Sequence, residues 1–354
     1  MTTTFNPGPS KVYPEIPAYV QDAYDQGILS INHRSEGFMT LCREAVELLK
    51  DRLSIPDSYR IVFTSSATEC WEVIAQSLTR TMSYHFYNGS FGEKWFTFAK
   101  NIRPKAKATT FDLTKMPDFE SIKLPKATEI LCFTHNETSN GTRIPQMALE
   151  SIHRKYPQAL IAIDATSSLG GIALDFSRID IAYGSVQKCL GLPAGLGLMI
   201  LSPRAVERAR QLNEGGHYNS LLRMLENMDK YQTHYTPNVL GIYLLKRSME
   251  KRYGIGPIHK RLEEQYKDLS EVITNSSVLD WMVPDEYLRS RTVLAVKAPA
   301  DRIAEIHRTA NEAGIQLGKG YGPHKETSFR IANFPAIDSE DVEKLKAFLL
   351  NNYS

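Results

Sequence analysis

The chain has 354 residues, of which 42% are hydrophobic and 23% charged, values typical of a globular protein with about two domains. Its 42 basic and 40 acidic side chains leave a net charge of +2, which argues against a dedicated nucleic-acid or membrane-surface binder. No apolar stretch approaches the ~18 residues of a membrane span, and the first residues lack a signal-peptide pattern. Four separated cysteines without a CxxC pair give no metal framework and favour a cytoplasmic location.

Up to about residue 240, short apolar runs alternate with amphipathic segments. Apolar residues recur at helical spacing between Phe38 and Leu49, and the pair Ser65–Ser66 is expected to cap a later helix. Strands are expected, in chain order, at 59–64, 82–87, 108–113, 129–134, 159–164, 179–183 and 196–202, with helices near 95–102, 147–156 and 204–212. This alternation predicts an α/β protein whose seven-stranded, mostly parallel sheet is covered on both faces.

The remainder of the chain has a different pattern. Two long helices are expected at 240–252 and 258–272, separated by the break Gly254-Ile-Gly-Pro257. A strand at 291–296, a helix at 300–313, a strand at 329–333 and a final helix from Ser339 follow. We therefore expect a large domain of residues 16–253 and a smaller α+β domain formed by 254–354 together with an N-terminal arm, 1–15.

Lys188 is the first candidate functional residue. It follows a buried strand and precedes a loop with glycines at 191, 195 and 197, at the kind of strand end where an α/β sheet presents residues to ligands. Most lysines are solvated surface residues. A desolvated lysine at such a position, however, has a lowered pKa and can form an imine.

Two other features have both a structural and a functional interpretation. Asp164 closes the apolar run 159–164, where it either caps the next turn or keeps a pyridine nitrogen protonated in a cofactor that acts as an electron sink. The segment Ser65–Thr68, between a strand and a helix, is either an ordinary helix cap or an anion site. The chain contains neither GxxxxGK[ST] nor GxGxxG, which disfavours nucleoside triphosphate and dinucleotide chemistry.

An anion site, an acid and a lysine in this order resemble the fold-type I pyridoxal-phosphate enzymes, and among them the class V aminotransferases of the phosphoserine group. The resemblance covers essentially the whole chain. Its motifs are Asn6-Pro-Gly-Pro9, Asn32-His-Arg-Ser35, Ser65-Ser-Ala-Thr68, Asn88-Gly-Ser-Phe91, Asn136-Glu-Thr138, Asp164, Gln187-Lys188, Tyr235-Thr-Pro237 and Phe329-Arg-Ile331. It implies pyridoxal 5′-phosphate as the cofactor, small amino and oxo acids as substrates, and a homodimer with active sites at its interface.

The resemblance also implies roles for individual residues around the cofactor. Lys188 would form the internal aldimine and move the proton between Cα and the cofactor, and Asp164 would pair with the pyridine nitrogen. Phe91 would stack on the ring, where the phosphoserine group usually has Trp, and Thr138 would hydrogen-bond the phenolic oxygen. The phosphate would be held by Ser66, Ala67, Thr68 and Gln187, together with Thr236 of the partner subunit.

For the substrate, the resemblance implies that Arg330 clamps the α-carboxylate with a bidentate pair. His33 and Arg34, which the partner subunit would supply, bind the distal anionic group. The phosphoserine group usually has a His-Arg pair shortly before the carboxylate arginine. Here the nearest match is His324-Lys325, which is shifted by one residue and followed by Glu326, an awkward neighbour for a phosphate.

The predicted reaction interconverts O-phospho-L-serine and 2-oxoglutarate with 3-phosphohydroxypyruvate and L-glutamate, as in serine biosynthesis. An alanine– or serine–glyoxylate aminotransferase is the alternative, because residues 33–38 and 136–141 also resemble those enzymes. A cysteine desulfurase is disfavoured, since those enzymes usually have His before the lysine and over the ring, where this chain has Gln187 and Phe91. A non-catalytic scaffold is disfavoured by Lys188 and Asp164.

Overall fold

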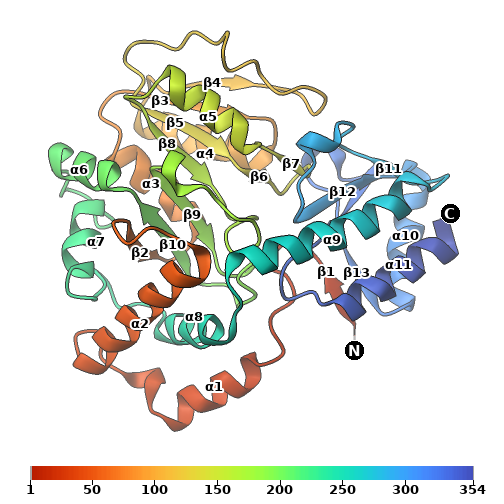
Figure 1. Ribbon diagram of the computed structural model, residues 1–354, viewed down its shortest axis with the longest axis horizontal. Helices are drawn as coiled ribbons and strands as arrows, with labels where there is room; N and C mark the ends of the chain where they lie inside the picture. Colours follow the sequence, from red (N-terminus) through yellow and green to blue (C-terminus); the bar gives the residue numbers. More distant parts are fainter. Residues whose placement is uncertain (1, 354) are drawn as a thin grey trace.

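The protein has two lobes, each built around its own sheet (Figure 1). The structure is a computed structural model that describes residues 2–353, so Met1 and Ser354, which fall in the predicted small domain, lie outside the described residues. A seven-stranded sheet forms the larger lobe and a five-stranded sheet the smaller one. Within residues 2–353, no helix combines the length and the apolar character that crossing a membrane requires.

The seven strands expected from the apolar runs are the seven strands of the large sheet, in the order β2-β10-β9-β8-β5-β3-β4. Their bounds are β2 (Arg60–Thr64), β3 (Ser83–Tyr87), β4 (Lys107–Thr110), β5 (Ile130–Thr134), β8 (Leu160–Asp164), β9 (Ile181–Ser185) and β10 (Gly197–Leu201). Only β10 runs antiparallel to its neighbours, and the other pairs are parallel. The predicted α/β fold with a mostly parallel sheet is confirmed.

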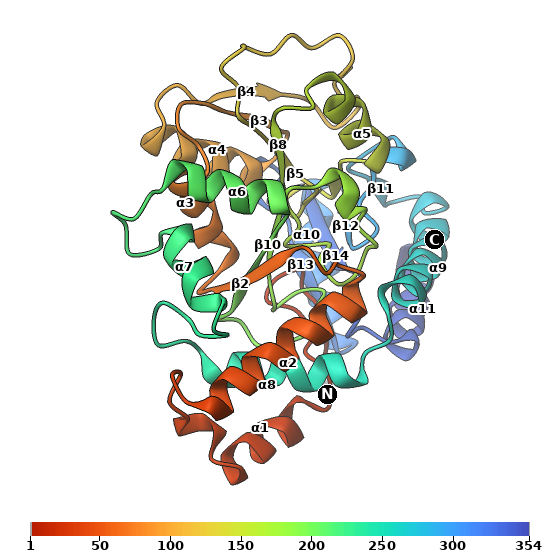
Figure 2. The same cartoon turned by 60° about the vertical axis from the view of Figure 1, so that its left-hand side comes forward.

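The central strands of this sheet are buried along their whole length, because helices cover both faces of the sheet. They are α2 (Glu36–Leu53), α3 (Ala67–Ser77), α4 (Ser90–Ile102), α5 (Gln146–Lys155), α6 (Pro203–Leu212), α7 (Leu221–Met228) and α8 (Val239–Lys251). In Figure 2, α2 lies along α8, and α1 (Ile16–Asp25) packs beneath them. The sequence patterns did not predict α1 or α7.

The small sheet has the order β1-β13-β14-β12-β11 and includes the N-terminal strand. Its elements are β1 (Thr3–Phe5), β11 (Asp280–Trp281), β12 (Val293–Lys297), β13 (Ile315–Lys319) and β14 (Ser328–Ala332), with helices α9 (Ile255–Thr274), α10 (Ala300–Glu312) and α11 (Ser339–Tyr353). β1 pairs in parallel with β13, whereas the other pairs are antiparallel. The sequence patterns missed β1, β11 and β13.

The expected break before α9 is shorter than predicted. α9 begins at Ile255, so that Gly256 and Pro257 belong to its first turn instead of separating two helices. A proline fits there because the first N–H groups of a helix have no intrahelical partner. Each lobe has its own hydrophobic cluster. The domain boundaries after residues 15 and 253 stay a prediction.

Candidate active site

A cavity of about 250 Å³ lies where strands of the large sheet end and the small lobe begins. Because parallel strands present their carboxyl ends at one edge, residues far apart in the chain meet there. Among the residues predicted from the sequence, those that line it are Ser66, Ala67, Thr68, Phe91, Thr138, Asp164, Gln187, Lys188 and Arg330. We call this space the lysine cavity.

Lys188 lies in the turn after β9 and is only 6% exposed. Its Nζ donates hydrogen bonds to Thr138 Oγ1 at 2.7 Å and to Ser167 Oγ at 2.9 Å. Burial lowers the pKa of Lys188 to about 8, although the negative charge of Asp164 opposes this shift. A substantial fraction of the amine is therefore neutral near physiological pH, as a nucleophilic lysine requires.

Asp164 is the last residue of β8 and is buried. Its Oδ1 accepts a hydrogen bond from the backbone N–H of Thr166 at 2.9 Å, which is the turn-capping bond of the structural interpretation. Burial raises the pKa of Asp164, while the charge of Lys188 acts in the opposite direction. The same carboxyl group lines the lysine cavity, so it both caps the turn and is available to a ligand.

The first turn of α3 brings backbone N–H groups to the lysine cavity. Ser66 caps this helix, since its Oγ accepts the N–H of Glu69 at 3.3 Å. The N–H of Ala67 donates to Ser185 Oγ at 2.8 Å, which ties the helix start to the end of β9. A helix N-terminus with small residues attracts anions through its dipole and its N–H groups.

Arg330 extends from β14 of the small sheet into the same cavity. Its Nη1 donates to the backbone oxygen of Thr138 at 2.9 Å and its Nε to that of Lys319 at 2.8 Å. Burial lowers the pKa of Arg330 to about 10, which still leaves the guanidinium charged at neutral pH. The cavity therefore contains a fixed cation that the large lobe does not supply.

An aromatic pair forms another wall. Phe91, in the first turn of α4, has its ring centroid 5.4 Å from Lys188 Nζ and 5.3 Å from the centroid of Tyr321. Lys94 Nζ donates a hydrogen bond to Tyr321 Oη at 2.9 Å. Sequence reasoning found Phe91 but missed Tyr321, because nothing in its local pattern indicates that its loop folds back onto α4.

Glu137 is a second residue that sequence reasoning missed as a site component. It is 1% exposed, and its carboxylate accepts the N–H of Gly92 at 3.1 Å and the N–H of Ser139 at 3.0 Å. The contact is close, since a Cβ on Gly89 would lie 2.3 Å from Glu137 Cγ. Glu137 therefore fixes the first turn of α4, which carries Phe91, beside Thr138. Its signal was the motif Asn136-Glu-Thr138, of which only the threonine was assigned.

Four predicted site residues lie outside the lysine cavity. His324, in the short helix η4 (Gly322–His324), lines a neighbouring cavity that shares Tyr321 with the lysine cavity. Arg34 Nη1 donates to Asn227 Oδ1 at 2.9 Å and to Gln232 Oε1 at 2.7 Å, on the surface near α7. The other two are His33, whose ring packs edge-on against Phe38, and Thr236, which is exposed.

The lysine cavity fits pyridoxal 5′-phosphate by its unsatisfied polar atoms. Within the described residues, the buried atoms Thr134 Oγ1, Thr166 Oγ1 and Gln187 Oε1 have no hydrogen-bond partner, and all three residues line the cavity. A buried polar atom without a partner costs about 1–3 kcal/mol, so these atoms favour a polar ligand. An anion site, an acid, an amine and an aromatic ring match a phosphorylated pyridine aldehyde.

Comparison with known proteins gives the family. The model of the aminotransferase class-V family matches residues 3–345, nearly the whole chain. The chain belongs to the class V aminotransferases. It is therefore a transaminase of the pyridoxal-phosphate-dependent kind, as predicted, and family membership implies that cofactor.

Individual relatives cover the chain almost completely. A phosphoserine aminotransferase of Rhodococcus opacus is 30% identical over 355 residues, which is 96% of this chain and 92% of the relative. The solved phosphoserine aminotransferase of Cytophaga hutchinsonii is 36% identical, with a TM-score of 0.94 and 99% coverage of both chains. The pyridoxamine–pyruvate aminotransferase of Mesorhizobium loti, at 20% identity and a TM-score of 0.86 over 99% of this chain and 91% of its own, shows the fold alone.

Proposed function

We propose that this class V aminotransferase interconverts O-phospho-L-serine and 2-oxoglutarate with 3-phosphohydroxypyruvate and L-glutamate, a step of serine biosynthesis. The observation that carries the substrate assignment is the near-complete coverage by relatives named phosphoserine aminotransferase, at 30% and 36% identity. The ureidoglycine–glyoxylate enzyme of Bacillus subtilis, at 20% identity, gives the glyoxylate alternative weaker support than these relatives give the phosphoserine reaction.

The residues of the lysine cavity account for the proton transfer. When bound, pyridoxal 5′-phosphate supplies an electron sink for the negative charge that forms at the amino-acid Cα. Lys188 would take the proton from the amino-acid Cα and deliver it to C4′ of the cofactor, and its lowered pKa suits both steps near neutral pH. Asp164, buried at the end of β8, holds a positive charge on the pyridine nitrogen.

Other residues of the lysine cavity bind the cofactor and orient the substrate. The start of α3, at Ser66, Ala67 and Thr68, receives the cofactor phosphate together with Gln187, and Thr138 binds the phenolic oxygen. Phe91 covers one face of the ring and keeps water away from it. Arg330 binds the substrate α-carboxylate with two parallel hydrogen bonds, which fixes the Cα–H bond relative to Lys188.

We further propose that a cytoplasmic homodimer completes the site, with Thr236, His33 and Arg34 acting in the partner's cavity. Large apolar side chains are exposed near these segments, including Tyr24, Leu29 and Tyr218. Of these, Tyr218 packs against His234 and Tyr235, next to Thr236, so the proposed interface would bury exposed aromatic surface beside that threonine. The distal phosphate of the substrate would meet His33 and Arg34 there, and His324 would lie nearby.

Subunit mixing tests the homodimer directly. Lys188→Ala and Arg34→Ala protomers are each expected to be inactive with O-phospho-L-serine. After exchange of equal amounts of the two subunits, about half of the dimers are heterodimers, and each heterodimer has one intact site out of two. Activity should therefore recover to about a quarter of the wild-type value. Mixtures that stay inactive despite demonstrated heterodimers would contradict the shared site.

Turnover with defined substrate pairs tests the reaction. Purified, cofactor-loaded protein is supplied with O-phospho-L-serine and 2-oxoglutarate, and in parallel with L-alanine or L-serine and glyoxylate. We expect the first pair to have a kcat/KM at least about 100-fold higher. The reason is that O-phospho-L-serine has both an α-carboxylate, for Arg330, and a phosphate, for His33 and Arg34. A preference for a glyoxylate pair would replace the proposed reaction with the alternative one.

A further inference from the structure

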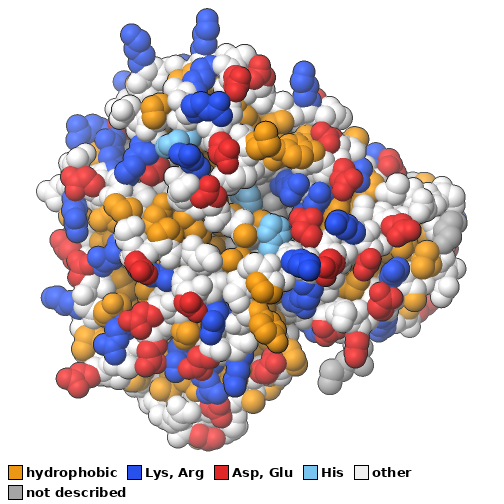
Figure 3. Space-filling model, in the orientation of Figure 1, with side chains coloured by type: hydrophobic (Ala, Val, Ile, Leu, Met, Phe, Trp, Pro, Cys, Tyr) orange, Lys and Arg blue, Asp and Glu red, His pale blue; other side chains and the backbone are white. Residues whose placement is uncertain are grey.

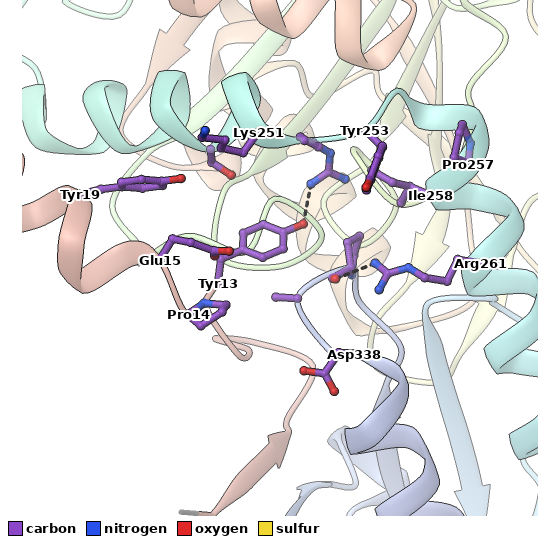
Figure 4. A pocket seen from close by; sticks show the side chains of 14 residues that line it. Tyr13, Pro14, Glu15, Tyr19, Lys251, Tyr253, Pro257, Ile258, Arg261 and Asp338 are labelled. Carbon is purple, nitrogen blue, oxygen red and sulfur yellow. Dashed lines mark hydrogen bonds between the residues drawn. The ribbon is translucent and has the colours of Figure 1, made fainter.

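A second cavity, of about 510 Å³, lies between the segment that leads into α1, the junction of α8 and α9, and the loop that follows β14. Figure 4 shows this space, which we call the hinge cleft. Three tyrosines and three prolines are among its fourteen lining residues, namely Tyr13, Pro14, Tyr19, Tyr253, Pro257 and Pro335. In Figure 3, hydrophobic side chains with Lys or Arg beside them lie at the notch where the two lobes meet.

The charges of the hinge cleft are not balanced. Arg261 donates one hydrogen bond, to the backbone oxygen of Pro335 at 2.8 Å, and within residues 2–353 neither it nor Lys251 forms an ion pair. Of the two acids in the lining, Asp338 pairs with Lys11 at 3.1 Å, and Lys11 also pairs with Asp341. The other, Glu15, lies with Lys251 and Tyr19 at the opposite end from Arg261 (Figure 4). Arg252 also lines the hinge cleft and donates to Tyr13 Oη and to backbone oxygens. Together with Arg261 it outweighs the shared Asp338–Lys11–Asp341 group, so the Arg261 end has an excess of positive charge.

We propose that the hinge cleft binds an aromatic carboxylate. An aromatic ring fits the space between Tyr13 and the prolyl and tyrosyl walls, where stacking and burial of apolar surface favour it. The carboxylate then meets Arg261, whose planar guanidinium is suited to a carboxylate. This ligand matches the cleft in both its apolar surface and its charge.

The hinge cleft also contacts the turn that carries Lys188. The N–H of Tyr13 donates to the backbone oxygen of Gly191 at 3.0 Å, and the N–H of Gly191 donates to that of Lys188 at 2.9 Å. Arg252 donates to Tyr13 Oη at 2.8 Å and to the backbone oxygen of Cys189 at 3.3 Å. Gly191 adopts φ +66°, and a Cβ there would lie 2.5 Å from the Tyr13 ring. Because Tyr13 and Arg252 both line the hinge cleft and hold the lysine turn, the proposal includes an effector role, in which a ligand packed against Tyr13 changes the environment of Lys188.

Calorimetric titration of the cofactor-loaded protein with 1-naphthoate tests the binding. We expect Arg261→Met to weaken binding about tenfold. The matched control is Lys260→Met, which removes the neighbouring cation on α9, whose partner is the exposed Glu264 at 3.9 Å, and should leave the affinity unchanged. In the wild-type protein, neutral 1-naphthamide should bind about tenfold more weakly than 1-naphthoate. Equal affinities for the acid and the amide, or tighter binding of 1-naphthylmethylamine, would overturn the proposal.

The lysine cavity also holds a carboxylate-binding arginine, so the two sites must be separated. The Arg330→Met variant should still bind 1-naphthoate, because the hinge cleft is unchanged. If this variant no longer binds 1-naphthoate, the binding site is the lysine cavity instead. The effector role predicts that saturating 1-naphthoate shifts the pH midpoint of the visible absorbance of the bound cofactor. Binding without any such shift would overturn that role. Neither readout depends on which amino acid is the substrate.

Discussion

The two cavities differ in ways that volume does not reveal. The hinge cleft, at about 510 Å³, is twice as large as the lysine cavity, at about 250 Å³. The smaller cavity, however, contains the buried charged groups Lys188, Asp164 and Arg330, and burial shifts the pKa of all three. Such shifts are typical of catalytic sites, whereas a large aromatic cleft with charges at its rim is typical of a binding site. The hinge cleft has one buried charged residue, Arg252, whereas the lysine cavity combines three buried charged groups of both signs with shifted pKa values, and this combination distinguishes the catalytic site from the binding site.

The sharpest contrast comes from removing the amine. Lys188→Ala should lower kcat by roughly 10³-fold or more, because it removes the amine that is proposed to move the Cα proton. The cofactor should stay bound through the phosphate site, which gel filtration followed by absorbance would show. The matched control, Lys105→Ala in an exposed loop, should have wild-type activity. Near-wild-type turnover by Lys188→Ala would contradict the mechanism.

Arg330→Gln removes the cation supplied by the small lobe. Charged hydrogen bonds are worth about 1.5–3 kcal/mol, so kcat/KM for the amino donor should fall roughly 10- to 150-fold. Since the arginine binds the α-carboxylate that all amino acids share, kcat/KM should fall by the same factor for O-phospho-L-serine and L-glutamate. A loss confined to O-phospho-L-serine would move Arg330 to the phosphate end of the substrate.

The lowered pKa of Lys188 predicts how cofactor capture depends on pH. Only the neutral amine attacks the aldehyde, so the rate of capture by the apoprotein should rise about tenfold per pH unit and level off near pH 8. The negative charge of Asp164 raises the pKa of Lys188, so Asp164→Asn should move the plateau to lower pH. Growth of the visible band after mixing measures both. A plateau near pH 10 would mean that the amine is solvated.

Glu137→Gln probes the support behind Phe91. The amide cannot accept both N–H groups that the carboxylate accepts, so one buried donor is left unpaired at a cost of about 1–3 kcal/mol of unfolding free energy. We also expect weaker cofactor binding, because the first turn of α4 carries Phe91. Chemical denaturation and cofactor titration measure the two effects. The exposed Glu93→Gln on the same helix is the control, and an equal effect there would contradict the positioning role.

Much of the fold follows from local patterns. The seven strands of the large sheet were predictable because each is a short apolar run that ends at a turn, as in Leu160–Asp164. β13 was missed because its five residues, Ile315–Lys319, include two exposed positions and a glycine, so that they form no apolar run. β1 is only three residues long and is a strand because it pairs with β13, a contact that local sequence does not encode.

For the candidate site too, the residues set by local sequence patterns were predictable, whereas those that depend on contacts between distant segments were not. Lys188, Asp164 and the start of α3 lie at strand ends or a helix start, which local patterns locate. Tyr321 and Glu137 act through contacts with α4, a segment distant in sequence, so only the folded chain brings them together. The hinge cleft was not predicted at all, because it is assembled from segments near residues 13–19, 248–261 and 335–338.

A half-reaction tests the central claim most directly. The cofactor-loaded protein is mixed separately with O-phospho-L-serine, L-glutamate, L-alanine and L-serine, and loss of the visible cofactor band is followed in a single turnover. We predict fast conversion by O-phospho-L-serine and L-glutamate and little by L-alanine. Fast conversion by L-alanine or L-serine, with little by O-phospho-L-serine, would contradict the proposed substrate and place the enzyme with the glyoxylate aminotransferases.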